Sequence, residues 1–162
     1  MTIVSAICNS FKQEILVGTH NFTASSGNTF KLALFSSDSA SLSKSTTAYT
    51  APSSANAVPT NTLEVSQSQT DGGASNSGYT AGGNALTSAT PVLSGDTACV
   101  KFSDTSFNSA TFTARGCLIY NSNASNKAVC VVNFGADKTV TSGTFTVQFP
   151  AQTAGNAIVQ IA

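Results

Sequence analysis

The sequence predicts an all-β protein: an antiparallel β-sandwich of jelly-roll or Greek-key type, with one short N-terminal helix, in a single domain over residues 1–162. Two observations lead to this fold class. Short apolar runs, several of them alternating with polar residues at a period of two, are separated by Gly, Asn, Ser, Asp and Pro. The alternation of strands and helices that a doubly wound α/β fold requires is absent. Hydrophobic residues make up 41% of the chain, which is enough for a core and argues against global disorder.

The N-terminal region contains the only predicted helix. Ser10-Phe11-Lys12-Gln13 has the form of a capping box, and Gly18 is typical of a residue that ends a helix. We therefore expect a helix of about two turns, with Phe11 and Ile15 on one face. Residues 1–11 are largely apolar and have no clear place in the strand pattern, so they are a candidate arm that reaches a neighbouring molecule. The alternative is that they form a first edge strand.

The first half of the chain has one strong strand signal. The run from Phe30 to Phe35 places Phe30, Leu32 and Leu34 on one side of a strand. Residues 36–61 are predicted to be a long polar loop region. Three weaker signals are a strand near Thr47 to Thr50, another at Leu63 to Val65, and a Gly-rich stretch from Asp71 to Gly83 around Tyr79. This last stretch lacks the following helix and the lysine of a phosphate-binding loop, so we expect turns there.

The second half of the chain is more regular and predicts six strands. Residues 144–149 alternate Thr, Phe, Thr, Val, Gln and Phe, which is typical of a half-buried antiparallel strand. Val129 to Val132 is continuously apolar, as expected for a central strand that is covered on both faces. The six predicted strands are Ala98 to Phe102, Ser109 to Ala114, Gly116 to Tyr120, Lys127 to Phe134, Thr144 to Phe149 and Ala157 to Ile161.

The predicted core is drawn from the apolar sides of these strands. Its expected members are Phe30, Leu32, Leu34, Phe112, Leu118, Val129, Val131, Phe145, Val147 and Phe149.

The composition is poor in charge, which limits the classes of function. Charged residues make up 9% of the chain, with seven basic and seven acidic side chains and no net charge, whereas soluble domains carry about 25%. The basic residues are spread singly, which argues against nucleic acid as a partner. No apolar run approaches the length of a membrane span, and residues 1–8 are too short and lack the basic flank of a signal peptide. We expect a protein made in a cytoplasm whose neutral surface suits broad protein contacts.

The four cysteines, Cys8, Cys99, Cys117 and Cys130, predict buried thiols rather than a metal site. No two are spaced as C-x-x-C, and the chain has one histidine, which is too little for a Cys/His zinc site. Cys117 and Cys130 lie inside apolar strand patterns, where cysteine acts as a small hydrophobe. A bridge between these two residues, from neighbouring strands, is the alternative. No metal or cofactor is predicted.

No pattern of catalytic residues accompanies the titratable side chains, so we expect no enzyme activity and no catalytic residue. The lone histidine, His20, has no Gly-x-Ser-x-Gly nucleophile motif beside it in the sequence. It follows a helix stop, where histidine commonly caps, packs or faces solvent. Arg115 lies between two strong strands and either pairs with a carboxylate or faces solvent in a turn. The acidic residues that would have to supply paired carboxylates are mostly far apart: Glu14, Asp38, Glu64, Asp71, Asp96, Asp104 and Asp137.

Several stretches resemble a family of small structural proteins of tailed bacteriophages. They cover nearly all of the chain, most weakly over residues 36–61, and they describe strands and turns rather than reaction centres. The resembling stretches are Gly-Thr-His-Asn-Phe (18–22), Asn-Thr-Phe-Lys-Leu-Ala-Leu-Phe (28–35), Gly-Tyr-Thr-Ala-Gly-Gly-Asn-Ala-Leu (78–86), Ala-Thr-Phe-Thr-Ala-Arg-Gly-Cys-Leu-Ile-Tyr-Asn (110–121), Asn-Phe-Gly-Ala-Asp-Lys-Thr (133–139), Thr-Phe-Thr-Val-Gln-Phe-Pro (144–150) and Ala-Ile-Val-Gln-Ile-Ala (157–162).

The resemblance implies a virion component, and the residues favour one role over others. A capsid cement or decoration protein fits a small β domain with a neutral surface. Such a protein binds the phage major capsid protein on the capsid exterior and, at three-fold lattice positions, is expected to be a homotrimer. A tail-fibre or receptor-binding module for host adsorption is the alternative, although 162 residues leave little room for a trimeric shaft.

Overall fold

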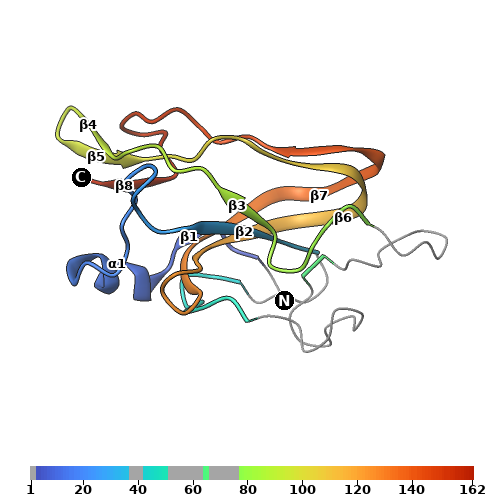
Figure 1. Cartoon of the computed structure of the whole chain (residues 1–162), viewed down its shortest axis with the longest axis horizontal. Helices are drawn as coiled ribbons and strands as arrows, with labels where there is room; N and C mark the ends of the chain where they lie inside the picture. The colour runs from blue at the N-terminus through green and yellow to red at the C-terminus, as the bar shows by residue number, and fades with distance from the viewer. Residues whose placement is uncertain (1–2, 37–41, 51–63, 66–76) are drawn as a thin grey trace.

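The computed structural model describes residues 3–36, 42–50, 64–65 and 77–162. These residues form two antiparallel sheets and one short helix, which confirms the predicted all-β, sandwich-like fold (Figure 1). In chain order the elements are β1 (Ala6–Ile7), α1 (Asn9–Leu16), β2 (Phe30–Phe35), β3 (Asn84–Leu86), β4 (Val92–Ser94), β5 (Thr97–Val100), β6 (Thr105–Asn121), β7 (Lys127–Val147) and β8 (Val159–Ile161).

The larger sheet is built on one long hairpin. Strands β6 and β7 pair from Asn121 opposite Lys127 to Thr105 opposite Val147. Strand β2 pairs along the other edge of β6, β3 pairs with β2, and β1 pairs with β7, which gives the order β1-β7-β6-β2-β3. The chain therefore crosses from one side of the hairpin to the other between β1 and β2, as Greek-key sheets do and a simple meander does not.

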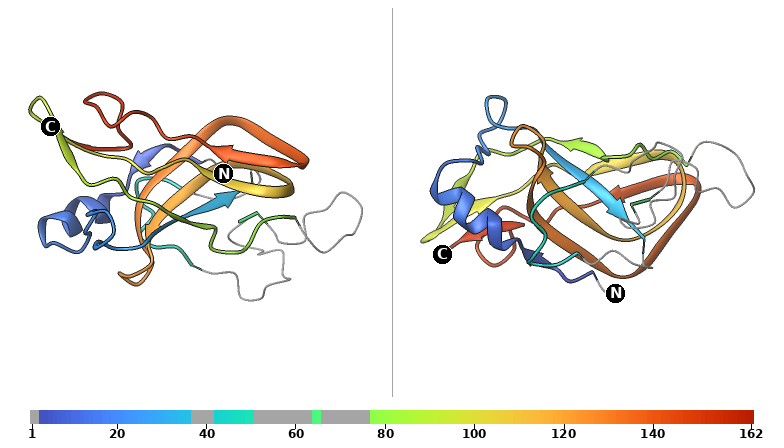
Figure 2. Two further views of the ribbon diagram at one scale, coloured as in Figure 1. Left: turned by 45° about the horizontal axis from the view of Figure 1, so that its top comes forward. Right: turned by 90° about the horizontal axis from the view of Figure 1, so that it is seen from below.

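The long hairpin is strongly bent, and the bends have local causes (Figure 2). Between the pairs Ala114–Lys138 and Gly116–Asn133, β7 holds three more residues than β6, and a bulge of this kind bends the strand. Gly135 lies in this bulge at φ 78°, and its amide donates a hydrogen bond to the side chain of Asn133 at 2.7 Å. Two further register shifts between Phe107 and Phe112 continue the curvature.

These bulges explain a difference from the predicted strands. The runs at 109–114 and 116–120 are parts of the single strand β6. The run at 127–134 is part of β7, and so is the run at 144–149 up to Val147, where β7 ends. The intervening polar residues predict breaks, but β-bulges keep the ladder of hydrogen bonds continuous through them. The predicted strand at 30–35 is confirmed to the residue.

The smaller sheet has the order β4-β5-β8 and lies at the end of the molecule that carries α1 (Figure 1). Strand β5 is central, with Val100 opposite Val159 of β8 and Leu93 of β4 opposite Ala98. Strands β5 and β8 match two predicted runs, and β1 lies in the segment for which a first edge strand was the alternative prediction. Strands β3 and β4 were not predicted, because three residues give too little periodicity.

The helix is confirmed, but it begins earlier than the capping box predicts. Its N-cap is Cys8, without a side-chain cap, and Ser10 lies within the first turn with a buried hydroxyl that has no partner among the described residues. Backbone contacts from other segments replace the cap: the amide of Cys8 donates to the carbonyl of Val129, and that of Asn9 to Lys44. The end is as predicted, with Gly18 at φ 71° after the last turn.

The N-terminal segment packs on its own domain from residue 3 onward. Ile3 and Cys8 are buried, and β1 pairs with the outer edge of β7. The amide of Asn133 donates to the hydroxyl of Ser5 at 2.8 Å, and the Asn133 side chain donates to the carbonyl of Ile3 at 2.6 Å. Of the two interpretations of this segment, the structure therefore shows the edge strand rather than a free arm.

The core is one continuous cluster that includes residues of both sheets. Seven predicted members are buried: Phe30, Leu32, Leu34, Phe112, Leu118, Val129 and Val131. Phe145, Val147 and Phe149 pack against this cluster but are only partly buried. They were predicted as core residues, and in the structure they border the core instead. Their strand does have the half-buried alternation that the sequence indicates, because its apolar side lines an open cavity.

Residues 42–50 and 64–65 contact the larger sheet without forming strands of their own. Ala48 makes an isolated bridge to Lys127, within the predicted weak strand, and Glu64 makes one to Phe35. Most of the predicted polar loop over 36–61, the position of Leu63 and the beginning of the Gly-rich stretch lie outside the described residues.

Candidate functional site

The lone histidine lies in a buried polar network behind the helix. His20 Nε2 is 2.8 Å from Glu14 Oε2, and Lys127 Nζ of β7 donates to Glu14 Oε1 at 2.6 Å. The His20 side chain is fully buried and that of Glu14 nearly so. Burial alone would raise the pKa of Glu14, but the hydrogen bonds and charges of Lys127 and His20 outweigh it and lower the pKa below its usual value. The network ties α1 to the central hairpin.

The tautomer of His20 follows from its second neighbour. The side-chain oxygen of Asn121 accepts the amide of Asn123 at 3.1 Å, so the Asn121 NH₂ group must face Asn28 Oδ1 and His20 Nδ1, at 3.0 and 3.1 Å. His20 Nδ1 therefore accepts a hydrogen bond, and Nε2 carries the proton toward Glu14. With both ring nitrogens engaged, His20 has no free nitrogen to act as a base.

A second buried carboxylate, that of Glu64, connects loop segments that lie beside β2. Glu64 accepts hydrogen bonds from the hydroxyls of Tyr49 and Tyr79, at 2.8 and 2.6 Å, and from the amide of Gly82 at 2.6 Å. Burial raises the pKa of Glu64, and the three donors counteract this shift in part. Tyr120 donates to the carbonyl of Gly82 at 2.8 Å, and burial and Glu64 raise its pKa to about 12. Both carboxylate oxygens of Glu64 accept hydrogen bonds from protein groups. We therefore interpret this cluster as structural: it holds the loops together.

The other titratable candidates from the sequence are not brought together. Asp96 lies in the β4–β5 turn, and Asp104 accepts the amide of Phe149 at 2.9 Å. Arg115 Nη1 lies 3.5 Å from Asp137 Oδ1 across the hairpin, a long contact between partly exposed side chains that contributes little. Asp38 and Asp71 lie outside the described residues.

The described part of the chain contains no cluster of three or more His, Cys, Asp or Glu side chains arranged for a metal ion. The four cysteines are all buried free thiols. Cys117 and Cys130 lie diagonally across β6 and β7, with Cys130 opposite Ile119 and Cys117 opposite Val132. No helix within the described ranges combines the length and the apolar character needed to cross a membrane.

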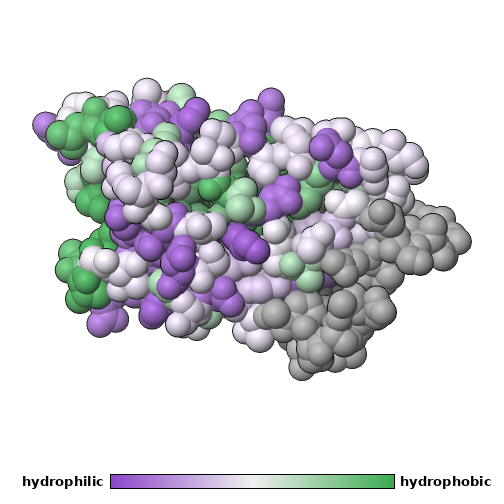
Figure 3. All heavy atoms as spheres, viewed as in Figure 1, coloured by the Kyte–Doolittle hydropathy of each residue, from purple (hydrophilic) through white to green (hydrophobic). Residues whose placement is uncertain are grey.

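The feature that stands out on the surface is an apolar end. Figure 3 shows two hydrophobic areas at the end of the molecule where α1 and the smaller sheet lie. We define the apolar end by five large apolar side chains with exposed fractions between 44% and 84%. They are Leu16, Val17, Val92, Leu93 and Ile161.

A hollow of about 460 Å³ connects the two parts of the apolar end. It runs from Ile15 and Gly18, beside the exposed Leu16 and Val17, to Ile161 of the smaller sheet. Its lining includes His20 but no Asp, Glu, Lys or Arg. Both outer strands of the smaller sheet, β4 and β8, have a free edge within the described structure. Exposed apolar side chains around an uncharged hollow are typical of a protein-contact surface.

Comparison of the chain with protein-family models, with curated proteins and with solved structures found no match in any of the three.

Sequence reasoning missed both the apolar end and the two buried carboxylates. The pair Leu16-Val17 before Gly18 is the one local signal for the apolar end, because two large apolar residues follow the buried face of a short helix. Glu14 occupies a helical position between Phe11 and Ile15, on the predicted buried face. The sequence holds no comparable signal for Glu64, whose partners are distant along the chain.

Proposed function

We propose that this protein is a structural component of a tailed-bacteriophage virion, a capsid decoration protein that binds across neighbouring subunits of the major capsid protein. The observation that carries this proposal is the apolar end, which would face the capsid. Its five exposed side chains and uncharged hollow suit a partner surface that is itself apolar. The resemblance of the sequence to small phage structural proteins supplies the partner.

The physical demands of the role match the chemistry of the chain. Packaged DNA pushes outward on the contacts between capsid subunits. A protein bound across those contacts stabilises the closed shell by the free energy of its binding. This work requires buried area and hydrogen-bonding groups but no reactive group. The low charge of the chain also gives little repulsion between copies, which supports the expected homotrimer on the capsid exterior.

The proposal is tested on particles stripped of this protein and then refilled with purified variants. Mass spectrometry counts the copies bound per major capsid subunit, and DNA release is followed on heating. We expect the Leu16→Ser/Leu93→Ser double variant to bind at least about tenfold more weakly, since each leucine loses most of its apolar contact. Particles refilled with this variant should release DNA at a lower temperature than those refilled with the unmodified protein.

The control is Val4→Ser, because Val4 is also an exposed apolar residue, 51% accessible, but lies outside the apolar end. It should bind and protect like the unmodified protein. Equal binding by the double variant would remove the apolar end from the proposal. Stripped particles that resist heat normally but no longer adsorb to host cells would replace capsid decoration by the tail-fibre or receptor-binding alternative.

A further inference from the structure

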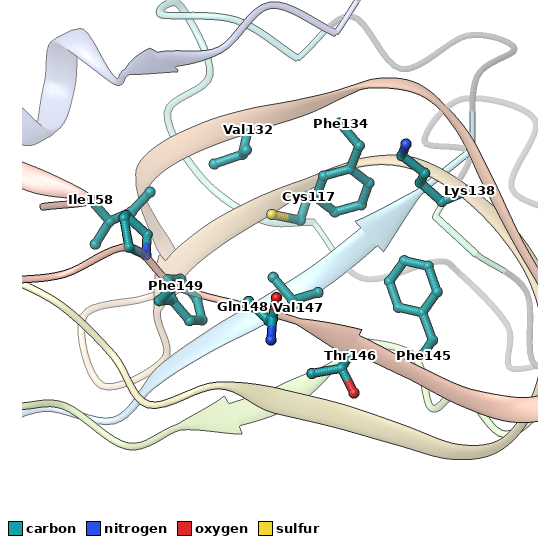
Figure 4. Close-up of a pocket in the computed structure, with 11 residues that line it drawn as sticks. Cys117, Val132, Phe134, Lys138, Phe145, Thr146, Val147, Gln148, Phe149 and Ile158 are labelled. Carbon is teal, nitrogen blue, oxygen red and sulfur yellow. The ribbon is translucent and has the colours of Figure 1, made fainter. Parts of the chain in front are cut away.

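The bent hairpin borders a second, open cavity, separate from the apolar end. Its volume is about 540 Å³, within the range of about 300–1,000 Å³ that small-molecule sites occupy. Figure 4 shows side chains from both halves of β7 turned toward this space, with Phe134 on one side and Phe145 and Val147 on the other. Phe149 and Ile158 close the end that is nearest to the smaller sheet.

The cavity wall is apolar but not buried. Phe145 and Val147 of β7, and Phe149 just after its end, remain partly exposed, although the alternating pattern of residues 144–149 is that of a core-facing side. The ring centroid of Phe145 lies 5.1 Å from that of the buried Phe112 and 6.2 Å from that of Phe134. Core residues therefore support the wall of the cavity. An apolar ligand that fits a supported apolar hollow of this size would gain binding free energy, because it removes apolar surface from water.

The rim of the cavity carries one cation. Lys138 lines the cavity and is exposed, with no ion pair to another described residue. The neighbouring carboxylate, Asp137, faces Arg115 instead. The remaining polar lining, Thr146 and Gln148, is uncharged. The cavity therefore combines an apolar interior with a single positive charge at its edge.

We propose that this cavity binds a monocarboxylate with a straight apolar chain of medium length, a free fatty acid. The chain would lie against Phe134, Phe145 and Phe149, and the carboxylate would pair with the Lys138 ammonium. One lysine matches one carboxylate, whereas a phosphate group would call for several donors at the same point. This site is independent of the capsid-binding role, and either proposal stands if the other fails.

The test is a calorimetric titration of the full chain with hexanoate, octanoate and decanoate. If the chain lies in the cavity, each added methylene should strengthen binding about fourfold. Lys138→Gln should weaken the binding of decanoate about threefold and leave the binding of 1-decanol unchanged, because the alcohol has no charge that could pair with the lysine. Lys12→Gln, which removes an exposed helix lysine away from the cavity, is the matched control and should change neither ligand.

A cavity-filling variant locates the site. Val147→Phe adds volume to the wall and should weaken decanoate at least tenfold. Because this variant could fold poorly, chemical shifts of the phenylalanine rings are measured in the unmodified protein as well, where decanoate should move the signals of Phe134 and Phe149. Affinity that does not grow with chain length, equal losses for acid and alcohol in Lys138→Gln, or unmoved phenylalanine signals would each overturn the proposal.

Discussion

At the residue scale, two buried glutamates hold together segments that are distant in the sequence. Glu14 joins α1 to the hairpin through Lys127, and Glu64 joins three loop positions beside β2. A buried carboxylate is costly unless donors satisfy it, and Glu14 has two donors and Glu64 three. Burial raises the pKa of Glu64, and its three neutral donors offset this only in part, whereas the hydrogen bonds and charges of Lys127 and His20 outweigh burial and lower the pKa of Glu14.

Removal of the Glu64 carboxylate should be strongly destabilising. Glu64→Ala leaves two tyrosine hydroxyls and one amide without their acceptor, and we expect it to lower the free energy of unfolding by about 3–5 kcal/mol. Glu64→Gln keeps one acceptor oxygen and should cost clearly less. Urea unfolding of both variants measures the difference. Equal, small effects would show that solvent replaces the carboxylate easily.

The thiols give a second prediction at this scale. Burial raises the pKa of Cys117 to about 12, and burial with the charge of Glu14 raises that of Cys8 to about 11. In the folded protein Cys8 and Cys117 should therefore react slowly with a thiol reagent at pH 8, since little of either is present as thiolate. In denaturant, without reduction, intact-mass analysis should count four labels. A count of two would reveal the Cys117–Cys130 bridge.

At the element scale, the hairpin and its neighbours are shaped by bulges and by glycines at positive φ. Gly83, at φ 69°, lies immediately before β3 with its Cα against the backbone of Leu32. A Cβ on Gly83 would overlap the carbonyl of Leu32. Gly95, at φ 61° in the β4–β5 turn, has open space around it. Both glycines have a positive φ, but only at Gly83 would a Cβ also overlap other backbone atoms.

Alanine at these two glycines should therefore differ in effect. Gly95→Ala introduces only the strain of a left-handed residue, about 1–2 kcal/mol. Gly83→Ala adds an overlap with backbone that forces β3 away from β2, and we expect a loss of about 3 kcal/mol or more. Thermal unfolding of the two variants compares them. Similar unfolding midpoints for the two variants would mean that β3 can move away from β2 without a loss of stability.

The two walls of the hairpin differ in burial, which gives a prediction for their phenylalanines. Phe112 is 4% exposed, and Phe112→Ala should cost about 3–5 kcal/mol, the usual range for a buried ring. Phe145 lines the open cavity, and Phe145→Ala should cost less, about 2 kcal/mol. Denaturant midpoints of the two variants check the order. A larger loss at Phe145 would mean that the cavity is closed in solution.

At the scale of the whole molecule, the two hollows lie in different parts of the fold. The apolar end is formed by α1 and the smaller sheet, and the cavity by the two halves of the bent hairpin. The proposals assign a protein partner to the first and a small molecule to the second. The first surface is broad and exposed, whereas the second is concave and braced by core residues.

Self-association is the prediction at this scale. Under the proposed decoration role, we expect the copies on the particle to be grouped in threes, because the chain has no net charge to keep copies apart and capsid lattices offer three-fold positions. Cross-linking of intact particles, followed by mass analysis, should give a trimer as the largest species. Monomers alone on the particle would contradict this expectation, whereas sedimentation of the isolated protein shows whether the trimer forms without the lattice.

The sequence by itself determined the all-β class, the short helix with its end at Gly18, the strand at 30–35 and most of the core. These features depend on local periodicity and turn residues, which a sequence displays directly. The tertiary structure alone decided the start of the helix, where backbone contacts from Val129 and Lys44 replace a side-chain cap. It also decided the fusion of four predicted runs into β6 and β7.

The apolar end and the cavity belong to the same second group. Ile15 and Ile161 are 146 positions apart in the sequence, and Phe134 and Phe149 are 15 apart, yet each pair lines one hollow. Their proximity depends on how the smaller sheet packs beside α1 and on how far the bulges bend the hairpin. Both are sums of many weak contacts between distant segments. A local pattern records which side of a strand is apolar, but only the packed chain decides whether another segment covers it.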